Sequence, residues 1–165
     1  MRILYICTHN RCRSILSEAI TNHLGGSLLI AASAGSHPEG EVHPLTLKYL
    51  AERGVSTHGL YSKSWDDKAI TEFNPSVVIT VCDSAANEPC PLWMGNATIL
   101  HWNLPDPSKV KGTEQEVADA FYAVMNVISE RVKKLIGLAR EGLSSSELSS
   151  RLRCIAREER ATEEA

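Results

Sequence analysis

Three residues near the start of the chain have the types and the spacing for nucleophilic chemistry on an oxyanion. Cys7 ends the apolar run ILYI, and Arg13 and Ser14 close the stretch CTHNRCRS that begins with it. A thiolate is the nucleophilic form of cysteine, and arginine offers a planar fork of donors to a tetrahedral anion. The pattern therefore predicts that Cys7 attacks and Arg13 binds the anion, with Ser14 placed to hydrogen-bond the thiolate. Without context, a buried apolar cysteine and a surface cation would be the favoured interpretation.

This chemistry needs a strand before the loop and a helix after it. The run RILYI is short, apolar and rich in β-formers, which is typical of a strand buried on both faces. Apolar residues then recur at helical spacing from Ile15 to Leu24, and two glycines end the pattern. A loop at a helix N-terminus directs backbone N–H groups and the positive end of the helix dipole at one point. That setting favours the nucleophilic interpretation of Cys7.

The rest of the chain alternates predicted strands with predicted helices. Strands are expected at 27–33, 76–82 and 97–102, and helices at 43–54, 64–73 and 114–139. Such alternation predicts an α/β fold with a doubly wound, four-stranded parallel sheet and helices on both faces. We expect residues 1–142 to form the catalytic domain. Residues 143–165 are expected to form a helical, charged extension that opens with a capping-box pattern, Ser144 to Glu147.

Composition and charge exclude several classes of protein. The 165 residues are 43% hydrophobic and 22% charged, as expected for one globular domain. A net charge of -3 argues against nucleic-acid binding, and the apolar stretches are too short to span a bilayer. Without a signal peptide, we expect a cytoplasmic protein. His37 and His43 lack partners at ligand spacing, so no metal site is expected, and His101 is interpreted as structural.

Two further cysteines and one aspartate are placed where they could join Cys7. Cys82 ends a predicted strand, and the carboxyl ends of parallel strands form the ligand-binding edge of such a sheet. Cys90 follows in a loop of small residues that could carry a thiol. Asp106 precedes Pro107 after the fourth strand and could protonate a leaving oxygen. The plainer alternatives are strand core for Cys82, a surface thiol for Cys90 and a turn residue for Asp106.

In its strand-loop-helix setting, CTHNRCRS resembles the phosphate-binding loop of the low-molecular-weight protein tyrosine phosphatase superfamily. With the Asp-Pro pair, the resemblance covers about residues 1–140. It implies a sheet of four parallel strands, with Cys7 as nucleophile, Arg13 as anion clamp and Asp106 as general acid. The implied oxyanion-binding loop comprises Thr8, His9, Asn10, Arg11, Cys12, Arg13 and Ser14.

The same resemblance suggests residues that brace the loop. Asn10, Glu18 and Ser33 match bracing positions, which in some members also hold a potassium ion. Lys63 could replace that cation here, and we expect no bound potassium. The plainer alternative for Glu18 is a solvated helix residue. His9 stands where the superfamily often has glycine, and Asn10 could compensate because asparagine tolerates left-handed backbone.

A second resemblance separates two activities of this fold. VITVCDSAANEPCPLW and the HW at 101–102 resemble the redox region of arsenate reductases built on the phosphatase fold, whereas DPSKVKG lacks the aromatic residues that grip phosphotyrosine. The resemblance implies reduction of arsenate to arsenite: Cys7 attacks arsenic, Cys82 attacks the Cys7 sulfur, and Cys90 attacks Cys82. The alternatives are a phosphatase acting on phosphotyrosine or a small phosphoester, and an idle oxyanion sensor.

The implied partners are arsenate, with phosphate or sulfate as mimics, and an external thiol reductant, with no tightly bound cofactor. Thioredoxin is one candidate reductant. The Cys82–Cys90 spacing is one residue longer than in the best-known thioredoxin-linked members, so glutaredoxin with glutathione is the other. Cys12 is interpreted as a packing or protective thiol outside the relay, and Cys154 in the extension has no assigned role.

Overall fold

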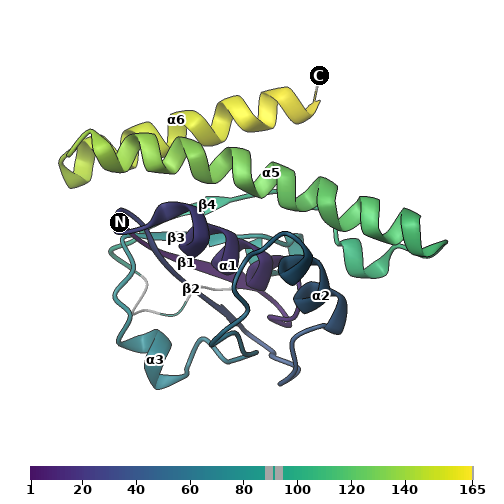
Figure 1. The fold of residues 1–165 in the computed structure, drawn as a ribbon. Coiled ribbons are helices and arrows are strands. Elements are labelled where there is room, and N and C mark those ends of the chain that lie inside the picture. Colours follow the sequence, from purple (N-terminus) through teal and green to yellow (C-terminus); the bar gives the residue numbers. More distant parts are fainter. Residues whose placement is uncertain (88–90, 92–94, 165) are drawn as a thin grey trace.

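Four parallel strands form the central sheet of the computed structural model, which describes residues 1–87, 91 and 95–164 (Figure 1). Their spatial order is β2-β1-β3-β4, so the chain winds outward from β1 in both directions. This is the predicted doubly wound four-stranded sheet, and the prediction is confirmed. The strands are β1 (Arg2–Cys7), β2 (Ile30–Gly35), β3 (Val77–Thr80) and β4 (Thr98–His101).

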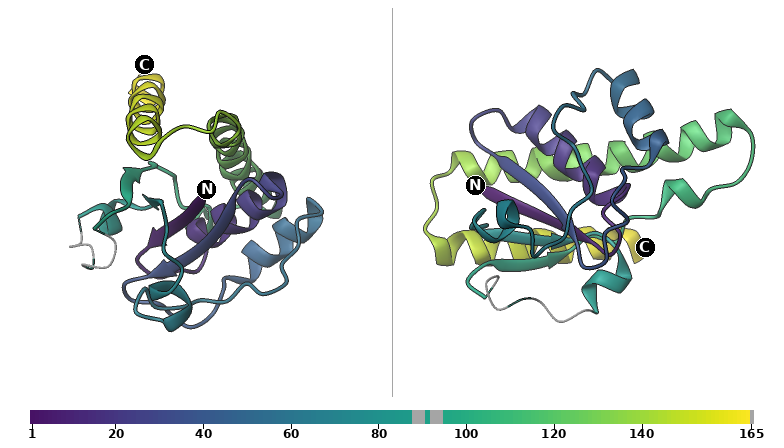
Figure 2. Two further views of the ribbon diagram at one scale, coloured as in Figure 1. Left: turned by 90° about the vertical axis from the view of Figure 1, so that its left-hand side faces the viewer. Right: turned by 90° about the horizontal axis from the view of Figure 1, so that it is seen from below.

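Helices flank the sheet (Figures 1 and 2). In Figure 1, α5 and α6 run above the sheet and α3 lies below it. Helix α1 packs against α5 as well as against β1 and β2, and α6 reaches β4. The helical elements are α1 (Arg13–Gly25), α2 (Pro44–Glu52), α3 (Lys68–Thr71), α4 (Asp83–Ala86), the 3-10 turn η2 (Pro107–Lys109), α5 (Glu114–Arg140) and α6 (Ser145–Glu164).

The core lies where the two central strands meet the helices. Every residue of β3 is buried, and so are all residues of β1 after Arg2, as their continuous apolar runs predict. The predicted stripe of α5 packs mainly against α1, and its residues Phe121, Ile128 and Val132 are fully buried in the core. Burying apolar surface on both faces of β1 and β3 fixes the carboxyl ends of these strands, where the candidate site lies.

Several elements differ from the sequence-based expectation, and the helix expected at 64–73 is reduced to the four residues of α3. Strand β2 begins at Ile30 rather than at residue 27, because its first partner is Arg2 and β1 begins there. The preceding residues instead form a turn in which Leu28 N–H donates to Gly25 O at 3.0 Å. Helix α4 was not predicted, because a single turn has no periodicity that a sequence can reveal.

The C-terminal extension is a helix that continues to Glu164. Its capping box is confirmed: Ser144 N–H donates to Glu147 Oε2 at 3.1 Å, and Glu147 N–H donates to Ser144 Oγ at 3.3 Å. In the charged last part of this helix, Glu159 pairs with Arg131 and Lys134 of α5, at 3.8 and 3.6 Å. No helix in the described ranges is long and apolar enough to cross a membrane.

Candidate active site

The loop after Cys7 lies directly against the end of the neighbouring strand. Cys7 pairs with Gly35 in the β1–β2 register, and α1 begins at Arg13. A Cβ atom on Gly35 would lie 2.5 Å from the backbone oxygen of Thr8. That oxygen also accepts a hydrogen bond from His37 N–H at 2.9 Å. A glycine at position 35 therefore lets the loop approach β2, a requirement that no motif in the sequence indicates.

Asn10 holds the loop from within. Its φ is 49°, the left-handed conformation expected for it, and its side chain is fully buried. Its Nδ2 donates to Ser14 Oγ at 2.8 Å and to Ser33 Oγ at 3.0 Å, while its Oδ1 accepts from Lys63 N–H at 2.9 Å. In the described part of the chain, the Ser14 hydroxyl bonds to Asn10 and has no hydrogen bond to the Cys7 thiol.

Glu18 belongs to the same buried network and is not a solvated helix residue. Ser33 Oγ donates to Glu18 Oε1 at 3.0 Å, and Lys63 Nζ lies 3.6 Å from that oxygen. Burial raises the pKa of Glu18, and the Lys63 ammonium and the Ser33 hydroxyl act in the opposite direction. The three residues predicted to brace the loop are therefore brought together, with Lys63 as their cation. Asp66, the acidic residue nearest to Lys63 in the sequence, is exposed and lies outside this network as the described residues form it.

The sulfurs of Cys7 and Cys82 share a hydrogen bond at the carboxyl edge of the sheet. This bond, followed by burial, raises the pKa of Cys7, against the lowering effect of the Arg13 guanidinium. The same bond lowers the pKa of Cys82 to about 5, and the Ala85 N–H and the Thr8 hydroxyl also lower it. The two thiols thus shift each other's pKa in opposite directions, while the Arg13 guanidinium favours the thiolate on Cys7 that the sequence indicated.

Asp106 and Arg13 form an ion pair at the wall of the nucleophile's pocket. Arg13 Nη2 lies 3.6 Å from Asp106 Oδ2, and Arg13 Nη1 donates to Leu104 O at 3.0 Å. Asp106 caps η2: its Oδ1 accepts from Ser108 N–H at 3.0 Å and from Ser108 Oγ at 2.5 Å. A carboxylic acid and a guanidinium thus approach the Cys7 pocket from two separate elements.

The pocket is small and charged. Its volume is about 260 Å³, and Cys7 and Cys12 lie in it together with Arg13 and Asp106. None of the described residues that line it is phenylalanine, tyrosine or tryptophan. Such a pocket suits a compact oxyanion rather than a phenyl ring.

Sequence reasoning missed four residues that line this pocket. Glu39 carries no motif, but it pairs with Arg11 of the loop at 3.1 Å. His43 caps α2 through its Nδ1, and burial followed by the nearby Arg11 lowers its pKa. The sequence held a signal for this cap, because His43 directly precedes Pro44 and proline is common at the first position of a helix. Ser108 and Lys109 complete the set.

The remaining cysteines take different places. Cys12 is buried, and its burial raises the pKa to about 12, so it is a protonated thiol beside the loop. Cys154 is exposed on α6. Cys90 lies outside the described residues. His101 is held by Thr80 Oγ1 at 2.8 Å and by Asp83 Oδ1 at 3.3 Å, as expected for a structural histidine.

Comparison with known proteins agrees with this arrangement. The family model described as low molecular weight phosphotyrosine protein phosphatase matches residues 2–148. The arsenate reductase of Bacillus licheniformis is 34% identical over 133 residues, which are 80% of this chain and 92% of that protein. The glutaredoxin arsenate reductase of Synechocystis sp. is 29% identical over 135 residues, covering 82% of this chain and 95% of that one.

Solved structures show the same fold. The thioredoxin-dependent arsenate reductase of Corynebacterium glutamicum superposes with a TM-score of 0.63 at 30% identity. The match covers 86% of this chain and 63% of that longer chain. The loop, the sheet order and these comparisons agree, and the chain belongs to the low molecular weight phosphotyrosine protein phosphatase family.

Proposed function

We propose that this protein is an arsenate reductase, which converts arsenate to arsenite by a relay of cysteine thiols. The observation that carries the proposal is the place of Cys82 beside the oxyanion loop: its sulfur lies 3.6 Å from the hydroxyl of Thr8, the residue after Cys7. Phosphoester hydrolysis needs one thiol, an arginine and an acid. A second thiol beside the nucleophile has no role in hydrolysis. It can form a disulfide with the nucleophile and so supply two electrons to the substrate.

The first step would form a bond between the Cys7 sulfur and arsenic. Arsenate, held by the loop amides and Arg13, takes the Cys7 proton on one of its oxygens as the thiolate attacks. Asp106 protonates the departing oxygen, which leaves as water. Arg13 turns from Asp106 to the anion in this step, and the Ser108 hydroxyl and amide keep the carboxyl in place.

The second step would transfer the electrons. The Cys82 thiolate attacks the Cys7 sulfur, and the electron pair of the sulfur–arsenic bond passes to arsenic. Arsenic(V) becomes arsenic(III), arsenite leaves, and a Cys7–Cys82 disulfide remains. The low pKa of Cys82, about 5, supports this role because the attacking sulfur is already ionised at neutral pH.

The relay would end with a dithiol reductant. Cys90 attacks Cys82, freeing Cys7 and leaving a Cys82–Cys90 disulfide, which thioredoxin or glutaredoxin with glutathione reduces. Relatives named for each reductant match the chain. We place the protein in the cytoplasm, where such thiols are kept reduced, and assign it no tightly bound cofactor.

The test is arsenite production with each reductant, followed by mass mapping of disulfides after one turnover. We expect a Cys82–Cys90 disulfide and steady turnover with thioredoxin or with glutaredoxin and glutathione. Replacing the exposed Cys154 by serine is the matched control and should leave both results unchanged. Absence of arsenite above background with either reductant would refute the proposal.

A further inference from the structure

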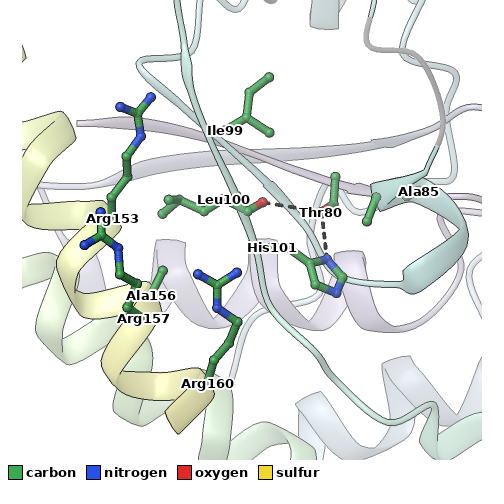
Figure 3. Close-up of a pocket in the computed structure, with 10 residues that line it drawn as sticks. Thr80, Ala85, Ile99, Leu100, His101, Arg153, Ala156, Arg157 and Arg160 are labelled. Atoms are coloured by element: carbon green, nitrogen blue, oxygen red, sulfur yellow. Dashed lines mark hydrogen bonds between the residues drawn. The ribbon is translucent and has the colours of Figure 1, made fainter.

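A second pocket lies between the edge strand β4 and the C-terminal helix α6, away from Cys7. Its volume is about 330 Å³, in the range of sites for small molecules. Figure 3 shows Arg153, Arg157 and Arg160 along the α6 side, facing His101 across the pocket. The loop residues that hold the oxyanion site do not line it.

The three arginines form one stripe of α6, because their spacing of four and three residues places them on the same face. None of these guanidinium groups has a hydrogen-bond or ion-pair partner within the described ranges, whereas Arg151 of the same helix pairs with Glu141 at 3.1 Å. The acidic residues of α6 nearest to α5 are turned the other way, with Glu159 on Arg131 and Lys134. The helix thus presents uncompensated positive charge to the pocket.

The opposite wall is apolar and contains no competing acid. Ile99 of β4 is 45% exposed, and Ala85 and Ala86 of α4 continue the aliphatic surface. None of the described lining residues is acidic, and the neighbouring Asp83 is paired with His101. The pocket therefore combines an aliphatic wall with positive charge on one side.

We propose that this pocket binds a small organic anion that carries at least two carboxylate groups on a short aliphatic framework. The carboxylates would meet the arginine forks, which suit such groups, and the framework would lie on Ile99 and the α4 alanines. A concave pocket between secondary-structure elements favours a small molecule over a protein surface. The proposal does not depend on the arsenate reductase assignment.

Ligands of this chemistry can come from two sources: acidic thiol peptides such as glutathione, and thiol-free polycarboxylates. The test uses S-methylglutathione, which cannot take part in thiol exchange, and citrate. We expect at least one to bind saturably by calorimetry and to shift the amide NMR signals of Ala85, Ala86 and Ala156. Affinity should fall as salt rises, because the contacts are ionic. Binding of S-methylglutathione alone indicates the peptide, and binding of citrate alone indicates the polycarboxylate.

The arginine variants decide whether binding occurs in this pocket. We expect Arg157→Gln and Arg160→Gln each to weaken binding about five-fold, as for partly exposed ionic contacts. Arg140→Gln removes an exposed guanidinium at the end of α5, which has no ion-pair partner among the described residues, and should have no effect. All three change exposed side chains, so folding should be retained. If neither probe binds, or if Arg140→Gln weakens binding as much as the pocket variants do, the proposal is wrong.

Discussion

The two thiols of the proposed relay are held in very different ways. The loop after Cys7 is fixed from beneath by Asn10, which bonds to two serines and to the backbone of Lys63, all buried. Cys82 is followed by the single turn α4, whose Asp83 side chain is 83% exposed and lies 3.3 Å from His101 Nε2. The loop of Cys7 is thus held by buried residues from separate parts of the chain, whereas Cys82 precedes a helix of only four residues.

The difference matches two kinds of chemical work. Binding and attacking an anion requires donors that stay in place, because preorganised groups stabilise the transition state without further rearrangement. Passing electrons requires a sulfur that changes partner, from Cys7 to a third thiol. Cys82 itself is buried, but the turn after it exposes Asp83, Ala86 and Asn87, and a segment with fewer buried contacts opens at lower cost in free energy.

Replacing Cys82 should separate anion binding and attack from electron transfer most completely. We expect Cys82→Ser to abolish multiple-turnover arsenite production, because no second sulfur remains beside Cys7. Hydrolysis of p-nitrophenyl phosphate should persist, since it would use Cys7, Arg13 and Asp106 alone. Steady arsenite formation by this variant, or loss of both activities with the fold intact by circular dichroism, would contradict the division.

A methyl group at position 35 should impair the anion-binding loop and leave the position of Cys82 unchanged. In Gly35→Ala the new Cβ would lie 2.5 Å from Thr8 O, so the loop must shift. We expect arsenate reduction to fall about 100-fold, because small displacements of positioning groups have effects of this size. Gly137→Ala is the control: a Cβ there meets nothing within 4 Å, and activity should be unchanged. Equal activity of both variants would show that the loop tolerates the shift.

The buried cation under the loop should matter more for stability than for chemistry. In Lys63→Met, Glu18 loses the ammonium that opposes the burial-raised pKa. We expect a loss of about 3 kcal/mol of unfolding free energy at neutral pH, as for a broken buried ion pair. Because the pKa of Glu18 is then raised further in the folded state, stability is greatest at acidic pH and is lost as pH rises.

Urea unfolding at acidic and neutral pH measures this effect. The double variant Glu18→Gln/Lys63→Met leaves no buried charge and should regain most of the lost stability. It should also lose the pH dependence. A single variant as stable as the wild type at neutral pH would place Lys63 outside the support of the loop.

The smallest expected effect concerns the proton shared by the two sulfurs. Cys82 is the main cause that raises the pKa of Cys7. In Cys82→Ala we therefore expect Cys7 to ionise at lower pH and to react several-fold faster with iodoacetamide near neutrality. Mass spectrometry of the Cys7 peptide across a pH series measures the change, and Cys154→Ala provides the comparison. An unchanged pH profile would mean that Arg13 and the loop control this thiol.

Much of the fold and the loop could be predicted from the sequence because local rules determine them. The apolar run RILYI predicts a buried strand in an α/β chain, and β1 forms there as predicted. Asn10 was expected to adopt left-handed backbone because it stands in a loop without glycine, and it does. These features depend on a few neighbouring residues.

What could not be predicted depends on contacts between distant segments. Gly35 matters only because Thr8 lies against it, and Glu39 matters only because Arg11 reaches it. The effect of Cys82 on the nucleophile could not be predicted for a related reason. The helix end and Arg13 favour a thiolate on Cys7, but Cys82, 75 residues further along the chain, raises the pKa of Cys7.

The contact between the two sulfurs joins neighbouring parallel strands, and this has a mechanical consequence. A Cys7–Cys82 disulfide would tie the first strand of the sheet to the third and close a loop of nearly half the chain. Closing a loop of that length restricts the unfolded chain and stabilises a native state by about 4 kcal/mol where the geometry is unstrained. In the proposed cycle this cross-link would form and be reduced once per turnover. The enzyme would therefore resist unfolding most as the Cys7–Cys82 disulfide intermediate.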